Sequence, residues 1–389
     1  MPEKASGSRL AFYGWTDYLL LNLVNTKESH FPNEPADLFV FNLKRVSIEL
    51  IDAIKESQVF DNVYLVQPLH QLNLTGFADK LKRLLSGRKY YRHYAQQMES
   101  FVGSTVYAIF FTGAFWSETL HIVRYLFNAS PAMEINFVEE GAASYADTDY
   151  LLRCMPRGGV REKIFSYMHY VKSHKRAKRQ LNNIYLYQPK LRTSSEGVKR
   201  LLPISELYFA EQILRKISMG KNIHPYDVSK FFYCVSPSIA GRQKVHDENR
   251  AILEGIMDSV NLSEILVMLH PVIVGAEADI YQNYDKEMHV SVSPALIEAV
   301  FIEIDVEDKV LISQGSTVLI TPKLMFDKEP FIIMTHRMYK DYAQFGNTGA
   351  DEFYNKIYSL YWNKERLYAP RTKEEMREII SNLYTGKPK

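Results

Sequence analysis

Two adjacent carboxylates, Glu139 and Glu140, follow a run of apolar residues and precede Gly141. Two acids at the end of a buried strand cannot both be buried cheaply, so each needs partners or one keeps its proton through a raised pKa. One carboxylate at a cleft can act as the general base that takes a proton from an acceptor hydroxyl. Gly141 permits a sharp turn and close approach of a substrate. A plain surface turn is the alternative interpretation.

A histidine–proline pair, His270 and Pro271, follows the expected strand of residues 264–269, which is apolar from Ile265 onward. Proline cannot continue a central strand, so Pro271 ends this one and His270 projects at the sheet edge. There the imidazole can donate to a phosphate oxygen or protonate a leaving group. Taken alone, His270 is better explained as a structural or surface histidine. A second pair, His224-Pro225, lies in a polar stretch where we expect a loop.

Small hydroxyl residues follow a third strand, residues 309–313, whose last residue is Ser313. Gly315, Ser316 and Thr317 come next and can present hydroxyls and backbone N–H groups to a phosphate. An ordinary helix N-cap is the alternative interpretation of these residues.

The positions of these residues depend on alternating apolar strands and amphipathic helices. The strands expected in the first half are residues 10–14, 37–42, 62–66, 105–111 and 134–138. Those expected in the second half are residues 230–235, 264–269, 309–313 and 331–334. Such alternation with continuous apolar strands predicts an α/β fold of two Rossmann-like domains, each with a parallel sheet covered on both faces. Ligands bind outside the carboxyl ends of such strands.

We place the domain boundary at a basic helical stretch, which gives an N-terminal domain of residues 1–180 and a C-terminal domain of residues 181–389. The basic side chains lie within residues 172–179. They form either a solvated helix face or a surface attracted to anionic membrane lipids or an anionic polymer.

Composition and motifs exclude several classes of protein. The 389 residues are 46% hydrophobic and 24% charged with a net charge of +2, typical of a globular protein without the field of a nucleic-acid binder. The two cysteines form no CxxC pair, and no P-loop, GxGxxG, HExxH or GxSxG motif is present. Without a signal-peptide pattern or an apolar run of ~20 residues, we expect a cytoplasmic protein.

Taken in order, Glu139-Glu140-Gly141, His270-Pro271 and Ser316-Thr317 resemble the acidic-acidic-Gly, His-Pro and serine/threonine signatures of bacterial sialyltransferases. The similarity is greatest to glycosyltransferase family 52, the lipooligosaccharide and capsule sialyltransferases, and next to the bacterial polysialyltransferases. LAFYGWTDYLLLNLVN is similar to the start of family 52 chains, and ISQGSTVLITPKLMF to their late serine-containing segment.

The resemblance implies a GT-B arrangement of two Rossmann-like domains facing a central cleft, with the acceptor on the N-terminal side and the nucleotide sugar on the C-terminal side. It implies an inverting transfer from CMP-sialic acid that needs no metal or other cofactor. Glu140 or Glu139 would be the base, with Asp247, at the start of a helix before His270, as a rival. His270, Ser316 and Thr317 would hold the donor phosphate, where hydrogen-bond donors stabilise the leaving group.

The acceptor implied is a hydroxyl of a surface glycan: lipooligosaccharide, capsule or exopolysaccharide. The resemblance also makes a homodimer our expectation, and the basic stretch 172–179 makes peripheral contact with the inner membrane surface another. Two alternatives stay open. The donor can be another CMP- or NDP-sugar, or the chain can be a non-catalytic polysaccharide-assembly protein that retains the fold.

Overall fold

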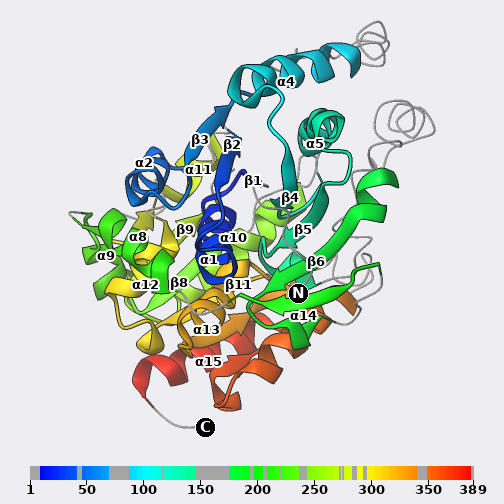
Figure 1. The fold of residues 1–389 in the computed structure, drawn as a ribbon. Helices are drawn as coiled ribbons and strands as arrows, with labels where there is room; N and C mark the ends of the chain where they lie inside the picture. Colours follow the sequence, from blue (N-terminus) through cyan, green and yellow to red (C-terminus); the bar gives the residue numbers. More distant parts are fainter. Residues whose placement is uncertain are drawn as a thin grey trace, which may run out of the picture. The chain divides into compact units, whose positions relative to one another are not determined.

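The structure is a computed structural model, in which contacts between residues divide the chain into two compact units, Met1–Ile213 and Leu214–Lys389. Each unit contains one parallel sheet (Figure 1). The residues that the structure describes are 9–41, 46–69, 87–115, 117–145, 175–192, 197–204, 208–219, 221–235, 243–270, 273, 276–282, 287–291, 296–339 and 348–386.

The first unit contains a seven-stranded sheet in the order β3-β2-β1-β4-β5-β6-β7, and all its strand pairs are parallel. Its strands are β1 (Arg9–Gly14), β2 (Ala36–Phe41), β3 (Asn62–Val66), β4 (Tyr107–Thr112), β5 (Glu134–Val138), β6 (Leu181–Leu186) and β7 (Arg200–Pro203). The chain runs outward from β1 to β3 and then returns to β4 on the other side of β1. This is the Rossmann order, and its switch point lies between β1 and β4.

Helices connect these parallel strands, because a parallel pair needs a crossover connection. They are α1 (Asp17–His30), α2 (Ile48–Ser57), α4 (Gly87–Val102) and α5 (Ser117–Ala129), with the short turns η1 (Ala142–Tyr145) and η2 (Pro189–Leu191). The helix α1 begins directly after β1, where the hydroxyl of Thr16 caps it by accepting a hydrogen bond from the N–H of Leu19. The local sequence therefore fixes a tight strand-to-helix turn at the switch point.

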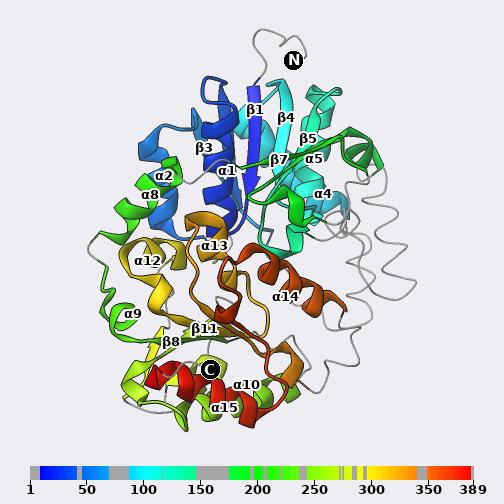
Figure 2. The same cartoon turned by 90° about the horizontal axis from the view of Figure 1, so that it is seen from below.

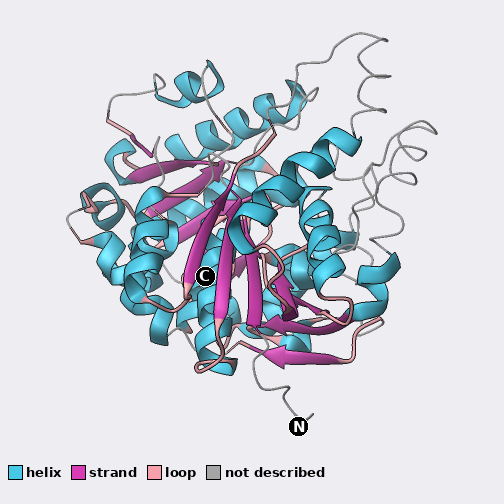
Figure 3. Cartoon of the chain, turned by 45° about the horizontal axis from the view of Figure 1, so that its top comes forward, coloured by secondary structure: helices cyan, strands magenta, loops and turns pink. Residues whose placement is uncertain are grey.

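Continuous apolar runs explain why these segments form central strands. All six residues of β2 are buried, and β1 is buried from Leu10 onward. The rings of Phe12 in β1 and Phe111 in β4 stack with their centroids 4.3 Å apart. Strands that are buried on both faces require helices on both sides, which Figure 3 shows.

The second unit contains a six-stranded parallel sheet in the order β10-β9-β8-β11-β12-β13. Figure 2 labels its two central strands, β8 and β11. Its strands are β8 (Phe231–Val235), β9 (Ile265–Leu269), β10 (His289–Ser291), β11 (Val310–Ser313), β12 (Phe331–Met334) and β13 (Leu367–Tyr368). This repeats the Rossmann order of the first unit, with the switch point between β8 and β11.

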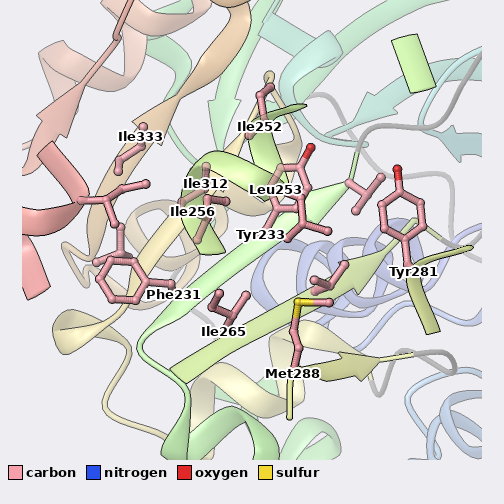
Figure 4. Packing of buried hydrophobic residues seen from close by; sticks show 14 of the residues in the cluster. Phe231, Tyr233, Ile252, Leu253, Ile256, Ile265, Tyr281, Met288, Ile312 and Ile333 are labelled. Atoms are coloured by element: carbon pink, nitrogen blue, oxygen red, sulfur yellow. The ribbon is translucent and has the colours of Figure 1, made fainter. Parts of the chain in front are cut away.

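The helices of the second unit cover its sheet and close its core. They are α8 (Tyr208–Ser218), which contains the division between the units, α9 (His224–Val228), α10 (Gln243–Met257), α11 (Ala276–Gln282), α12 (Ile297–Glu303), α13 (Thr321–Phe326), α14 (Thr348–Leu360) and α15 (Lys373–Thr385). The short turns are η3 (Leu262–Glu264), η4 (Val306–Asp308), η5 (Thr317–Leu319), η6 (Thr335–Met338) and η8 (Lys364–Arg366). Figure 4 shows Phe231 and Tyr233 of β8 packed with Leu253 and Ile256 of α10.

The structure confirms the predicted fold class. Three predicted strands, residues 62–66, 134–138 and 331–334, coincide with β3, β5 and β12. The other predicted strands differ from the observed ones by one or two residues at an end. The pair His224-Pro225, which we expected in a loop, instead begins α9, where proline is tolerated because the first helical N–H groups lack partners.

The division between the units falls after Ile213, later than the boundary expected after residue 180. The reason is that β6 and β7 continue the first sheet beyond the basic stretch. Asn182 and Asn183 interrupt the apolar pattern of β6, although both are buried, and β7 is only four residues long and ends at a proline. Neither segment has the continuous apolar run by which the other strands were predicted.

Candidate active site

Residues that follow β1, β4 and β5 lie at the carboxyl edge of the first sheet. Trp15 comes after β1, Gly113 after β4, and Glu139 and Glu140 after β5. The strands β1 and β4 flank the switch point, where loops diverge and ligands bind in open parallel sheets. This edge is therefore the expected place for chemistry in the first unit.

The side chain of Glu140 is partly exposed, and Trp15, which lies at the switch point, holds its carboxylate by a hydrogen bond. Its Oε1 accepts a hydrogen bond from the indole N–H of Trp15 at 2.7 Å, and its backbone N–H donates to the hydroxyl of Ser144 at 2.8 Å. Trp15 itself is almost fully buried, so the indole is a fixed donor. A carboxylate that is oriented and still reachable can accept a proton from a bound hydroxyl group.

Two glycines shape the turn around Glu140. A Cβ atom added at Gly113 would lie 2.9 Å from the Cβ of Glu140 and 3.1 Å from its Oε2. Gly113 therefore leaves the space that the Glu140 side chain occupies. Gly141 has a φ of 120°, which side-chain-bearing residues rarely adopt, and this supports the predicted sharp turn.

Glu139 is fully buried and accepts three hydrogen bonds through its carboxylate. The hydroxyl of Tyr18 donates to Oε1 at 2.8 Å, the hydroxyl of Tyr145 donates to Oε2 at 2.6 Å, and the backbone N–H of Tyr187 donates to Oε2 at 3.0 Å. The side chain of Asn22 donates to the backbone carbonyl of Glu139 at 2.9 Å. These partners come from α1, η1 and the segment after β6.

Burial raises the pKa of Glu139 to about 7, although the three hydrogen bonds act in the opposite direction. Burial also raises the pKa of Tyr18 and of Tyr145, and the nearby negative charge of Glu139 raises both further. Because the phenols stay protonated, Glu139 is the group in this cluster that can change charge near neutral pH.

At the carboxyl edge of the second sheet, the hydroxyl residues after β11 have two different environments. Ser313 is fully buried, and its hydroxyl donates to the carbonyl of Cys234 at 3.0 Å, which ties β11 to β8. Ser316 is the N-cap of η5 and accepts a hydrogen bond from the N–H of Val318. Ser316 and Thr317 are partly exposed, and Gly315 is exposed. Ser316 thus forms the cap that we gave as the alternative to phosphate binding.

Two further predicted residues of the second unit, His270 and Asp247, are exposed. His270 directly follows β9, at the same edge as the residues after β11, but β8 separates the two strands. Pro271 lies outside the described residues. Asp247 lies on α10. His270 and Asp247 are therefore accessible side chains and not parts of the core.

A cluster that the sequence did not predict follows β12, the neighbour of β11. The imidazole Nε2 of His336 lies 3.1 Å from Oδ1 of Asp351, and the guanidinium of Arg337 donates to the same oxygen at 2.8 Å from Nη2. Burial lowers the pKa of His336, and the hydrogen bond to Asp351 opposes this shift. The ion pair of Arg337 and Asp351 ties η6 to α14, and Gly315 lies close to α14 and to Met334, the last residue of β12.

Solved structures resemble this chain in fold at very low sequence identity. A UDP-GlcNAc 2-epimerase from Neisseria meningitidis, bound to UDP-GlcNAc, matches with a TM-score of 0.50 and 10% identity over 97% of each chain. The calicheamicin glycosyltransferase CalG4 matches with a TM-score of 0.49 and 12% identity over 97% of this chain and 90% of that chain. The fold is of the GT-B type. No protein-family model matches the sequence, and the search of curated proteins finds no match.

The predicted site residues of this GT-B chain fall into two groups. The first unit carries Glu139, Glu140 and Gly141, which the structure brings together with Trp15 and Gly113. The second unit carries Asp247, His270, Ser313, Gly315, Ser316 and Thr317. Their roles in catalysis stay predictions.

Four residues of the first group were not predicted: Trp15, Tyr18, Gly113 and Tyr145. Trp15 and Tyr18 lie in the segment LAFYGWTDYLLLNLVN, on which the resemblance partly rests, and Tyr145 follows closely after Gly141. No local sequence pattern assigns a role to any of them. Trp15 is separated from Glu140 by 125 positions. Only the strand order, which brings β1 and β5 to the same edge, makes them neighbours.

The predicted basic surface is only partly described, since residues 171–174 lie outside the described ranges. Residues 175–180 are helical, and Lys175, Lys178 and Arg179 are exposed. Arg176 instead packs over the ring of Phe127 at 4.3 Å. Contact with anionic lipids stays a prediction, as does a homodimer.

Within the described ranges, no group of three or more His, Cys, Asp or Glu side chains is arranged to hold a metal ion. The helices in the same ranges include none that combines the length and apolarity needed to cross a bilayer.

Proposed function

We propose that this protein is a glycosyltransferase that moves a sugar from a nucleotide donor to a hydroxyl group. The observation that carries the proposal is the position of Glu140 at the switch-point edge, where the indole of Trp15 orients its carboxylate and Gly113 leaves room for it. The GT-B type of fold supports the same class, because the epimerase with this fold is bound to a nucleotide sugar.

On the acceptor side, the proposed role of Glu140 is that of general base. It takes the proton of the acceptor hydroxyl while the oxygen of that hydroxyl forms a bond to the anomeric carbon of the donor sugar. Attack opposite to the leaving group inverts the configuration at that carbon. The hydrogen bond from Trp15 fixes the direction of the carboxylate before the hydroxyl arrives.

On the donor side, the bond between the anomeric carbon and the phosphate oxygen breaks, and the nucleotide leaves with the bonding electron pair. His270 and the hydroxyls of Ser316 and Thr317 are the proposed donors to the phosphate. Hydrogen bonds at that oxygen stabilise the charge that develops during departure. The buried Ser313 has a different part in this scheme: it holds β11 in register with β8 through Cys234.

For the donor we propose CMP-sialic acid, used without a metal or other cofactor. The support is a succession of three motifs that resemble signatures of bacterial sialyltransferases, Glu139-Glu140-Gly141, His270-Pro271 and Ser316-Thr317. A UDP-sugar is the second candidate, because the epimerase with the TM-score of 0.50 is bound to UDP-GlcNAc.

A donor screen tests the proposal. The full chain is incubated with CMP-sialic acid, CMP-Kdo or UDP-GlcNAc in the presence of a chelator, with water as the acceptor of the sugar, and release of the free nucleotide is measured. We expect release from CMP-sialic acid alone. Glu140→Gln is expected to lower the rate by about 10²- to 10⁴-fold, the usual contribution of a general base.

Matched variants control for effects on the fold. Glu134→Gln changes the carboxylate at the other end of β5, and His289→Ala changes a histidine at the start of β10. Both should retain full rate, whereas His270→Ala should not. Release from UDP-GlcNAc alone would remove the sialyl assignment and keep the transferase. If no donor is consumed or bound, the non-catalytic assembly protein is the better description.

A further inference from the structure

The carboxylate of Glu139 is unusual because its charge is stabilised without a cation. Within the described part of the chain, it forms no ion pair with a lysine, arginine or histidine, and its partners are two phenols and one backbone N–H. Burying such a charge is costly, and a sequence has no packing reason to place one here. The arrangement therefore needs a functional explanation.

We propose that Glu139 is a positioning residue, whose hydrogen-bonded carboxylate fixes the direction of Glu140 without touching the substrate. The inference rests on the proposed role of Glu140 as general base. It also assigns different roles to the two acids: Glu139 is fully buried and Glu140 is partly exposed.

The connection runs through the backbone. The carboxylate of Glu139 joins Tyr18 of α1, Tyr145 of η1 and the N–H of Tyr187. Its carbonyl accepts from the side chain of Asn22, whose Oδ1 accepts in turn from the hydroxyl of Tyr187 at 2.9 Å. Both ends of residue 139 are thus held, so the following residue leaves β5 in one direction.

A second set of bonds holds the other side of Glu140. Its N–H donates to the hydroxyl of Ser144, and the carbonyl of Ser144 accepts from the guanidinium of Arg192 at 2.6 Å. Ser144 and Tyr145 are neighbours in η1, so the same turn contacts both acids. A change at Glu139 is therefore transmitted to Glu140 through η1 as well as through β5.

The hydrogen-bond cage of Glu139 consists of the hydroxyls of Tyr18 and Tyr145 and the backbone N–H of Tyr187. It fits the ionised carboxylate, because all three groups donate. When Glu139 gains a proton, one donor must turn away; the phenols can rotate, whereas the N–H of Tyr187 cannot. The titratable groups that face the carboxylate are the phenols of Tyr18 and Tyr145, whose hydroxyls donate to it. The phenol of Tyr187 donates to Asn22 instead, and the charged groups Glu140 and Arg192 both bond to Ser144 in the adjoining turn. With a pKa of about 7 for Glu139, this change falls near neutral pH.

The first test is the dependence of kcat on pH for donor consumption. Tyr145→Phe removes one donor, which raises the pKa of Glu139 and should move the acid limb of kcat upward by about one pH unit, with KM for the donor unchanged. Glu139→Gln should lower kcat about tenfold and abolish the limb near pH 7. The control is Tyr107→Phe, which removes a buried phenol bonded to Asp37 and should leave the limb in place.

A uniform fall of kcat at every pH in Tyr145→Phe, with the limb unmoved, would show that the cage is only structural and would overturn the inference. Because Glu139→Gln can also disturb folding, Tyr145→Phe is the deciding variant.

The second test does not need turnover. Trp116 and Trp362 are replaced by phenylalanine, so that emission reports Trp15 and its hydrogen bond to Glu140. We expect a change of emission with a midpoint near pH 7 that moves upward in Tyr145→Phe and is absent in Glu139→Gln. A chain that consumes no donor yet shows this behaviour would refute the proposed function alone. No transition in the parent, or one unchanged in Glu139→Gln, would refute the positioning role.

Discussion

The first sheet buries two carboxylates with tyrosine partners, one at each edge, and they differ in what balances their charge. At the amino edge, Asp37 accepts from the guanidinium of Arg9 at 2.7 Å and from the hydroxyl of Tyr107 at 2.6 Å. At the carboxyl edge, Glu139 accepts from two phenols and an N–H, and no cation is among its contacts in the described residues.

Asp37 therefore helps to hold the fold together, whereas Glu139 can gain and lose a proton near neutral pH. The guanidinium of Arg9 offsets the charge of Asp37 and ties β1 to β2. Glu139 is held by dipoles alone, so burial raises its pKa to about 7 and its charge responds to pH. An acid of the second kind suits the role proposed for Glu139 beside Glu140, and it lies at the edge of the sheet where ligands bind in open parallel sheets.

Among the substitutions that test this difference, Asp37→Asn should have the largest effect on stability. The amide would leave the charge of Arg9 without its buried partner and should lower the free energy of unfolding by about 3 kcal/mol or more. Glu139→Gln should destabilise far less at pH 8, because it removes a buried charge that no cation offsets. Urea denaturation of both variants measures the difference, and equal losses would contradict the distinction.

The next prediction concerns the dependence of stability on pH. The folded protein holds a proton at Glu139 more tightly than the unfolded chain, in which the pKa is near 4.5. The stabilising contribution is therefore complete below pH 4.5 and is lost as pH rises through 7, by about 3 kcal/mol in total. The free energy of unfolding of the parent, minus that of Glu139→Gln, should fall by this order between pH 5 and pH 8. A rise would reverse the assigned sign.

A smaller effect is expected at the glycine that makes room for Glu140. Gly113→Ala places a Cβ 2.9 Å from that of Glu140 and should lower stability by about 1–2 kcal/mol and kcat about tenfold. Gly315→Ala is the stability control, since its Cβ would meet Met334 at an ordinary 3.6 Å. Thermal unfolding that ranks the two variants in the opposite order would show that the space at Gly113 is not needed.

The smallest effect should come from the exposed acid that shares Arg9. Asp61 lies 2.5 Å from the guanidinium, but half of its side chain is accessible to solvent. Exposed pairs contribute about 0–1 kcal/mol, so Asp61→Asn should cost less than Asp37→Asn and lose its effect in high salt. Unfolding experiments at two salt concentrations measure this, and a salt-independent loss as large as that of Asp37→Asn would mean that burial is not what separates the two acids.

Sequence patterns predicted the fold well where burial leaves a continuous apolar run. The apolar run FIIM predicted β12 to the residue. The same reasoning missed β6, because Asn182 and Asn183 are polar although the sheet buries them. The side-chain amide of Asn182 donates to Glu134 of β5 at 2.5 Å, a partner 48 positions away that no local pattern contains.

The candidate site was predicted only as a set of strand ends. Glu139 and Glu140 stand out because two acids follow an apolar run, yet the sequence gives no means of distinguishing them. Their different burial depends on Tyr18 and Trp15, which α1 and the end of β1 bring from over 100 residues away. Ser313 is a different case. Its hydroxyl is of a type that can bind a phosphate, but it is buried and donates to the backbone carbonyl of Cys234 inside the sheet.

Each sheet is built from one uninterrupted stretch of chain: the last strand of the first ends at Pro203, and the first strand of the second begins at Phe231. During synthesis, the first sheet can therefore be completed before any strand of the second leaves the ribosome. Aggregation-prone strands of the two halves are then not exposed together. We expect nascent chains arrested shortly after the first unit has emerged to contain a protease-resistant domain, and cleavage throughout such chains would show that the halves fold only together.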